Sequence, residues 1–218
     1  NAKKVQPKHV GENNFVHNNF HQNYSKDLMN TLETVSGKKI NISNPDPSTI
    51  DITDIAWALS RMPRFSGHTI PYIPYSVAQH CIQVAKDLAP HGPEIQLYGL
   101  LHDAAEAYIN DLPSPVKHIP EIHAVISKLE DLLMLTIYKA LNIRPPTAEE
   151  ERIVKIADKN QQAVEAYNFM YSRGSDWNLP KVNFKKLQEF EDPMTSVQAY
   201  DTFLDFYHLL ASEILKAK

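Results

Sequence analysis

Apolar residues recur at helical spacing over most of this chain. From about residue 51 to the C-terminus they return every three or four positions, in segments bounded by cap residues, proline or glycine. Ile52, Ile55 and Leu59 begin the pattern and predict an amphipathic helix over about residues 51–62, which Pro63 stops. Segments of this kind bury their apolar stripes by packing helix against helix. We therefore expect an all-α fold.

Helix start signals divide the rest of the pattern. Ser76 with Gln79 and Thr195 with Gln198 are typical of a capping box, and Thr147 is typical of an N-cap. The further helices expected are 76–90, 93–108, 121–142, 147–171 and 195 to the end, with a loop over 174–193. The last helix has an apolar stripe of Val197, Tyr200, Leu204, Tyr207 and Ile214. Together these segments predict a bundle of about six helices.

The first 50 residues follow no helical pattern. Residues 1–30 are rich in Asn and His without regular spacing, which predicts a flexible N-terminal arm; metal binding by its histidines and an oligomer-swapped tail are the alternatives. Ile40 and Ile42 alternate between turn residues, which favours a small hairpin or an extended lead-in. We expect one folded domain over residues 31–218 after this arm.

Composition excludes several classes of function. The chain has 218 residues, with 22 Lys plus Arg against 26 Asp plus Glu, and a net charge of −4 offers no basic field for nucleic acid. Its apolar runs are far shorter than the roughly 18 residues of a membrane span. A single Cys excludes an internal disulfide, and the N-terminus lacks the pattern of a secretory signal. We expect a cytoplasmic protein with neither nucleic acid nor membrane as partner.

Two histidines and an aspartate are expected to face the core. His80 lies between Val77 and Val84, so it points inward with the apolar face of its helix. His102 and Asp103 are adjacent within the expected 93–108 helix. Neighbouring helical side chains are splayed by about 100°, so both can converge only on an object between them, beside the helix axis. A cation is the natural object.

Two more carboxylates complete the group. Glu106 follows Asp103 by three residues and lies over the same point one turn later. Asp158 lies beside apolar neighbours on the 147–171 helix. Hydrogen-bonded core histidines and paired acids are the alternative interpretation. However, five unpaired inward polar groups would cost about 1–3 kcal/mol each, which favours a shared ligand.

A mixed nitrogen and oxygen donor set predicts one divalent metal ion, with Co²⁺, Mn²⁺, Fe²⁺, Mg²⁺ or Zn²⁺ all possible. Such an ion lowers the pKa of its water and polarises a phosphoryl oxygen. An unligated carboxylate at Glu106 could take or return the proton, which would make it a catalytic residue.

The pattern of His80, His102–Asp103 and Asp158 resembles the HD-domain metal-dependent phosphohydrolases. The surrounding segments YSVAQHC at 75–81, LLHDAAEAYINDLPSPVK at 100–117 and IADK at 156–159 carry the resemblance. They look like the five-prime deoxynucleotidases and the small phage and bacterial nucleotide phosphohydrolases. The resemblance covers about residues 36–165. It implies that the four pattern residues bind the metal and that Glu106 supports the attacking water.

The same resemblance implies residues that bind the substrate. Asp111 matches an acidic residue near the sugar, and Lys117 matches a basic residue near phosphate. Arg64 and Phe65 resemble an Arg–aromatic pair, a phosphate contact beside a ring that stacks on sugar or base. The sequence departs from this pattern at Asn110, where these deoxynucleotidases carry Gly, so the turn before Asp111 is an open point.

Spacing alone adds one further substrate contact. Lys155 precedes Asp158 by three residues on one helix face, from which it could reach an anion at the metal; a solvated surface lysine is an equal alternative.

Metal-dependent hydrolysis of (deoxy)nucleotides is the function expected, by stepwise removal of phosphates from mono-, di- or triphosphates. Three alternatives are a triphosphohydrolase that releases nucleoside and triphosphate, a non-catalytic nucleotide-binding protein, and a di-metal oxygenase. A second metal at His118 and His123 is a lesser possibility. Phe203, Phe206 and Tyr207 on the last helix offer surplus apolar surface, which predicts a homo-oligomer, at least a dimer.

Overall fold

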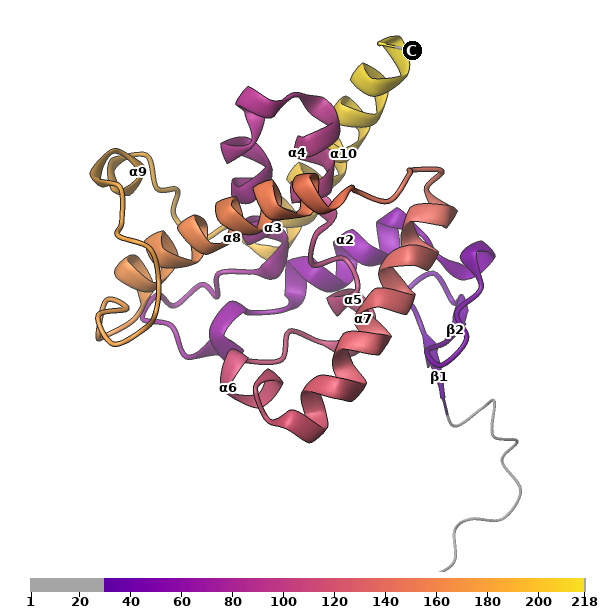
Figure 1. Cartoon of the computed structure of the whole chain (residues 1–218), viewed down its shortest axis with the longest axis horizontal. Helices are drawn as coiled ribbons and strands as arrows, with labels where there is room; N and C mark the ends of the chain where they lie inside the picture. The colour runs from indigo at the N-terminus through magenta and orange to yellow at the C-terminus, as the bar shows by residue number, and fades with distance from the viewer. Residues whose placement is uncertain (1–29, 218) are drawn as a thin grey trace, which may run out of the picture.

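Helices dominate the structure, a computed structural model that describes residues 30–217 (Figure 1). The predicted all-α class is confirmed, and the predicted arm, residues 1–30, lies almost wholly outside the described residues. The helices are α2 (Ile52–Arg61), α3 (Val77–Asp87), α4 (Pro93–Leu101), α5 (Glu106–Ile109), α6 (Ser114–Lys117), α7 (Pro120–Ala140), α8 (Ala148–Phe169), α9 (Phe184–Gln188) and α10 (Ser196–Lys216). Within residues 30–217, six of them have nine residues or more, in agreement with the prediction of about six helices.

A small hairpin precedes the helices. Strand β1 (Thr31–Glu33) pairs antiparallel with β2 (Lys39–Asn41), and Leu32 lies opposite Ile40. Gly37 in the connecting turn has a φ of 82°, which residues with a side chain rarely adopt. Ile40 is buried, so the hairpin packs one side chain into the helical core. Of the two alternatives left open by the sequence, the structure has the hairpin.

Capping residues start the long helices where the sequence predicted. Thr147 and Thr195 form complete capping boxes with Glu150 and Gln198. Ser76 accepts a hydrogen bond from the backbone N–H of Gln79, but the reciprocal half of the predicted box is absent. The Gln79 side chain instead bonds the backbone of Asp192 and Met194, because that segment covers the start of α3.

Helix α3 lies at the centre of the bundle, in contact with α2, α4, α8 and α10. Its contact with α4 is especially close at Gly99. A Cβ there would lie 2.5 Å from Cδ1 of Leu88 and 3.3 Å from the backbone of Ala85. Glycine allows this approach without displacing Leu88, and the approach brings the end of α4 alongside α3.

The predicted 93–108 helix is wrong in one respect, because it breaks into α4 and α5. Residues 102–105 form a tight turn in which the N–H of Ala104 donates to Leu101 at 2.9 Å and that of Glu106 to Asp103 at 3.0 Å. The imidazole of His102 has its Nδ1 2.7 Å from the carbonyl oxygen of Gly99. In a continuous helix, that carbonyl would accept a hydrogen bond from the N–H of Asp103. The side chain of His102 takes the place of this helix hydrogen bond.

Two irregular stretches also hold short helices that the sequence did not predict. Helix α6 follows the irregular residues 111–113, and α9 interrupts the predicted 174–193 loop. No helix within residues 30–217 has both the length and the apolar character needed to cross a membrane.

The inward face of α10 differs from the predicted stripe. Ala199, Phe203 and Leu210 are buried, whereas Val197 is 60% exposed. Phe203 is completely buried in the core, so it cannot supply oligomer surface as the sequence suggested. The reason is that the core contacts of α10 come from helices α2, α3 and α4, which no local pattern specifies.

Candidate metal centre

Two imidazole rings face each other across α3 and the turn after α4. The side chain of His80 is completely buried, and its Nδ1 lies 2.6 Å from Oε1 of Glu165 on α8. The Nδ1 of His102 lies 2.7 Å from the carbonyl oxygen of Gly99. These acceptors assign the ring proton to Nδ1 in both residues. The Nε2 atoms are then lone-pair donors, and both are buried without a hydrogen-bond partner in the described chain.

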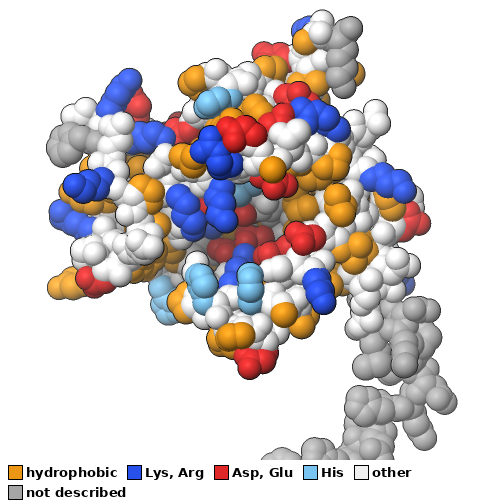
Figure 2. All heavy atoms as spheres, viewed as in Figure 1, with side chains coloured by type: hydrophobic (Ala, Val, Ile, Leu, Met, Phe, Trp, Pro, Cys, Tyr) orange, Lys and Arg blue, Asp and Glu red, His pale blue; other side chains and the backbone are white. Residues whose placement is uncertain are grey.

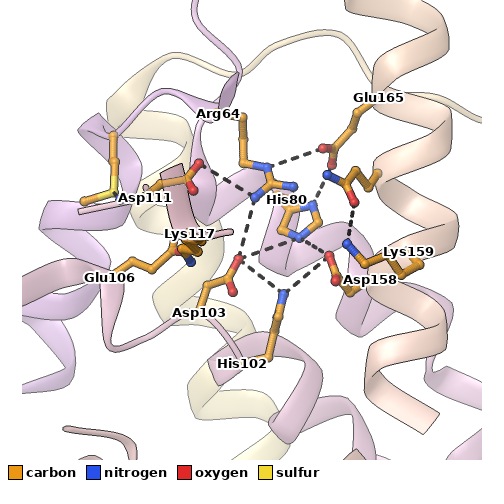
Figure 3. Close-up of polar contacts among 12 residues, drawn as sticks. Arg64, His80, His102, Asp103, Glu106, Asp111, Lys117, Asp158, Lys159 and Glu165 are labelled. Carbon is orange, nitrogen blue, oxygen red and sulfur yellow. Dashed lines mark hydrogen bonds and ion pairs between the residues drawn. The ribbon is translucent and has the colours of Figure 1, made fainter. Parts of the chain in front are cut away.

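Two carboxylates close the gap between the imidazoles. Oδ2 of Asp103 lies 3.8 Å from Nε2 of His80 and 3.3 Å from Nε2 of His102. Oδ1 of Asp158 lies 3.2 Å and 3.9 Å from the same two nitrogens. Figure 3 shows the four side chains converging from α3, the 102–105 turn and α8.

These spacings fit a divalent ion. Ligand atoms about 2.1 Å from an octahedral ion lie about 3 Å apart when adjacent and about 4.2 Å apart when opposite. His80, His102 and Asp158 have ligand atoms within 4.8 Å of one another, and the contacts of Asp103 fall in the same range. Two neutral imidazoles with two carboxylates suit Mn²⁺, Fe²⁺, Co²⁺ or Zn²⁺ and leave positions for water.

Electrostatics keep both aspartates ionised. Without a metal, the pKa values of His80 and His102 are raised, and burial would raise the pKa of Asp158. The close approach of protonated His80 and the charge of His102 nevertheless lower the pKa of Asp158 to about 2. Burial would also raise the pKa of Asp103, and the neighbouring His102 more than offsets this effect, so the pKa is well below its usual range. Both groups are therefore present in the form that binds a cation.

Glu106 lies beside this group at the start of α5. Its Oε1 accepts from the ammonium of Lys117 at 3.1 Å, and its buried Oε2 has no partner within the described residues. Burial, together with the charges of Asp103 and Asp111, raises its pKa to about 9. The ammonium of Lys117 also lies 3.0 Å from Glu130 on α7, so the expected phosphate contact is held between two carboxylates.

Arg64 reaches the same centre from the turn after α2, residues Arg64–Gly67. Its guanidinium lies 3.8 Å from Asp103, 3.8 Å from Asp111 and 3.4 Å from Glu165. The residue is 8% exposed, so it is a buried cation aimed at the centre. The sequence left open whether the chain turns before Asp111 when Asn replaces Gly. It does turn, because Asn110 adopts a φ of 69°, and Asp111 consequently lies near Arg64.

Other predicted site residues lie farther out. Phe65 is half-buried, with its ring centroid 5.4 Å from the guanidinium carbon of Arg64. Lys155 is exposed on α8 and makes no ion pair with this group within residues 30–217, so the structure does not bring it to the centre. His118 and His123 form hydrogen bonds with Ser114 and Ser127 of their own segments. Among the described residues, neither belongs to a cluster that could bind a metal ion.

Sequence reasoning missed Glu165. Its side chain is completely buried and contacts both His80 and Arg64. It lies seven residues after Asp158 on α8, which is two helical turns along the same face. A carboxylate at that spacing, among the apolar residues Ala163, Val164 and Ala166, was the sequence signal that could have identified Glu165.

A hollow marks this region on the molecular surface. Figure 2 shows acidic side chains gathered in a depression between α8 and α7, with Lys, Arg and His side chains around its edge. The side chains of Asp103 and Asp158 are 20% and 22% exposed, so the centre is open to solvent on one side.

Comparison with known proteins agrees with this geometry. The HD domain profile matches residues 76–162, which include both histidines and both aspartates of the centre. The uncharacterised protein YfdR of Escherichia coli K12 is 30% identical over 86% of this chain and 99% of its own length. The chain belongs to the HD domain family. HD proteins are generally metal-dependent hydrolases, and the donor set described here fits that property.

Two further relatives lie within the same family. The uncharacterised protein RCAP_rcc00048 of Rhodobacter capsulatus is 33% identical over 61% of this chain and 69% of its own length. A protein of Photorhabdus temperata named 5'-deoxynucleotidase yfbR is 26% identical over 60% of this chain and 75% of its own length. Arg64 and Glu165 lie outside the matched HD segment and join its centre only in the folded chain.

Proposed function

We propose that this HD protein hydrolyses phosphate ester or anhydride bonds of (deoxy)nucleotides, with one divalent metal ion held by His80, His102, Asp103 and Asp158. The observation that carries the proposal is the pair of buried, unpartnered Nε2 atoms between two ionised carboxylates. The likeness to a protein named 5'-deoxynucleotidase supports the choice of substrate class.

A divalent ion bound there would supply Lewis acidity toward a phosphoryl oxygen and lower the pKa of a water. The side chains around it have separate tasks. Arg64 is a buried guanidinium that can bind phosphate oxygens through two N–H groups once a substrate displaces its long contacts to Asp103 and Asp111.

Glu106 is the group that can hold a proton. Its Oε2 is buried and unpartnered within the described chain, and Lys117 fixes the orientation of the carboxyl through Oε1. In its protonated form this carboxyl can donate a proton to a leaving oxygen. It can accept a proton from an attacking water only when ionised, a form that a cation bound at the neighbouring centre would favour. We therefore assign Glu106 as the catalytic acid and base, and Lys117 as the residue that positions it.

Product analysis tests the proposal. The purified protein is stripped of metal, reloaded with Co²⁺, Mn²⁺ or Mg²⁺, and incubated with nucleoside mono-, di- and triphosphates, with products resolved by chromatography. Stepwise dephosphorylation releases inorganic phosphate, whereas the alternative triphosphohydrolase releases inorganic triphosphate. Binding without turnover under every metal would overturn the enzymatic proposal and favour a nucleotide-binding protein.

A matched pair of variants separates the metal from proton transfer. Asp103→Ala should lose both the metal, by elemental analysis, and turnover, because an essential ligand is gone. Glu106→Gln should retain the metal and lose about 10²–10⁴-fold in kcat, the usual contribution of an acid or base. A full equivalent of metal and a normal rate in Asp103→Ala would disprove the ligand assignment.

A further inference from the structure

An unusual backbone turn holds Phe65 beside the proposed active site. Phe65 has φ and ψ of 54° and 32°, and Ser66 has 53° and 28°, both left-handed. A bulky residue rarely adopts this conformation, which costs about 1–3 kcal/mol, and such residues concentrate at functional sites. The strain persists because both ends of the loop are tied, with Arg64 N–H donating to Tyr75 at 2.8 Å and Val77 N–H to Met62 at 2.9 Å.

A second aromatic ring meets Phe65 from a distant part of the chain. The centroid of Trp177, in the loop after α8, lies 5.6 Å from that of Phe65, with the ring planes inclined at 52°. Because the rings are tilted, they form two sides of a corner and do not cover each other's faces. Trp177 is 36% exposed and Phe65 is half-buried, so both rings keep surface that a ligand can cover.

The contacts run outward from the metal centre in a fixed order. The guanidinium of Arg64 lies 3.8 Å from Asp103 and its central carbon lies 5.4 Å from the Phe65 ring. Trp177 in turn contacts Phe65, and exposure rises along this series from 8% at Arg64 to 36% at Trp177. A nucleotide whose phosphate lies at the centre would extend its sugar and base along the same direction.

We propose that Trp177, together with Phe65, forms the surface on which the nucleobase stacks, so that Trp177 determines specificity for nucleotides over phosphoesters without a base. This inference rests on the proposed function and names a residue outside the matched HD segment. Every base has a π-face, so the two rings contribute affinity for nucleotides without selecting strongly among the four bases.

Tryptophan fluorescence tests the proposal directly. The chain has two tryptophans, and the other, Trp57, lies on α2 against Tyr200 and Arg61. In Trp57→Phe all tryptophan emission comes from Trp177. A deoxynucleoside monophosphate should change this emission saturably, whereas inorganic phosphate and deoxyribose 5-phosphate should leave it unchanged. In the complementary Trp177→Phe variant, all tryptophan emission comes from Trp57. This emission should not change with the nucleotide, with inorganic phosphate or with deoxyribose 5-phosphate.

Steady-state kinetics of Trp177→Ala provide a second test of the stacking proposal. Trp177→Ala should raise KM for deoxynucleoside monophosphates about tenfold or more and leave kcat and the rate with deoxyribose 5-phosphate within about twofold, because a stacking contact far from the scissile bond acts on binding. Circular dichroism checks that Trp177→Ala is folded. The fluorescence test with Trp57→Phe keeps Trp177 in place, so it does not depend on the folding of Trp177→Ala.

The outcomes separate this inference from the proposed function. If the wild-type protein hydrolyses nucleotides while Trp177 emission and the Trp177→Ala KM stay unchanged, the stacking proposal is wrong and the proposed function stands. If the wild-type protein neither binds nor hydrolyses any nucleotide, both are wrong.

Discussion

Asn110 makes the turn that places Asp111, and it does so at a conformational cost. Its φ and ψ are 69° and 158°, in a region that essentially only glycine occupies without strain. The N–H of Asn110 still closes α5 by donating to Glu106 at 2.8 Å, and its side chain is exposed. The position therefore tolerates Asn where the resemblance drawn from the sequence implies Gly.

Replacing this residue should reveal the strain. Asn110→Gly should raise the free energy of unfolding by about 1 kcal/mol, because glycine adopts this φ without a Cβ clash. Asn110→Ala should lower it, since alanine lacks the short polar side chain that eases positive φ. Urea unfolding of both variants measures the difference. Equal stabilities would show that the conformation is unstrained.

Glu165 links a proposed metal ligand to the proposed phosphate-binding arginine. Glu165→Gln should weaken Mn²⁺ or Co²⁺ binding about 10–100-fold, because a carboxylate behind a ligating imidazole fixes its orientation and raises its basicity. Isothermal titration calorimetry measures the affinity. Glu191→Gln is the matched control, since within residues 30–217 the one ion pair of Glu191 is with Lys86 at the surface. Unchanged affinity in Glu165→Gln would remove its positioning role.

Glu106 should make the stability of the metal-free protein depend on pH. Its pKa is raised from the usual 4.5 to about 9 by burial and by its acidic neighbours, so the folded state binds a proton that the unfolded state releases. Stability contributed by this group is then present below pH 4.5 and is lost as the pH rises toward 9. In chelator, Glu106→Gln should melt at a higher temperature than wild type at pH 8, with the difference vanishing near pH 4. A constant difference at both pH values would contradict the raised pKa.

At the scale of the helices, the approach of α4 to α3 decides where His102 lies. The hydrogen bond from His102 to the Gly99 carbonyl is formed in the last turn of α4, where glycine lies against Ala85 and Leu88. Helix α8 brings Asp158 and Glu165 to the opposite side of the centre on one face. The metal centre is thus a product of helix packing.

Gly99→Ala tests this dependence. The added Cβ would lie 2.5 Å from Cδ1 of Leu88 and 3.3 Å from the backbone of Ala85, so the Leu88 side chain must shift and the two helices must separate slightly. We expect a loss of about 1–3 kcal/mol in stability, typical of overpacking, together with weaker metal binding. Thermal melts and metal titrations measure both. Glu94→Ala, a change at the opposite end of the same helix where the side chain pairs with Arg144, should alter metal binding little.

At the scale of the whole molecule, the predicted homo-oligomer depends on the outer face of α10. Phe203 no longer supports it, but Phe206 and Tyr207 are half-buried, and Leu209 and Leu215 are 52% and 72% exposed. Apolar area of this kind favours association. Light scattering at micromolar concentration should give at least twice the mass of one chain, and Leu209→Arg should reduce it. Val35→Arg, in the hairpin, is the control; a monomeric wild type would refute the prediction.

The residues that a single helix can specify were predictable from the sequence. His80, the His102–Asp103 pair, Glu106 and Asp158 follow from apolar neighbours, from spacings of three and four positions and from a short resemblance, and the fold places all of them together. The caps at Thr147 and Thr195 are local for the same reason. Each of these features needs only residues within two turns of a helix.

The contacts between distant segments were decided by tertiary structure alone. Glu165 meets His80 across 85 residues, and Trp177 meets Phe65 across more than a hundred. The break between α4 and α5 depends on a side chain taking a helix carbonyl, and the burial of Phe203 depends on three other helices. Local spacing specifies which face of a helix a residue occupies; only packing specifies what that face meets, because burial energy is gained between elements and not within them.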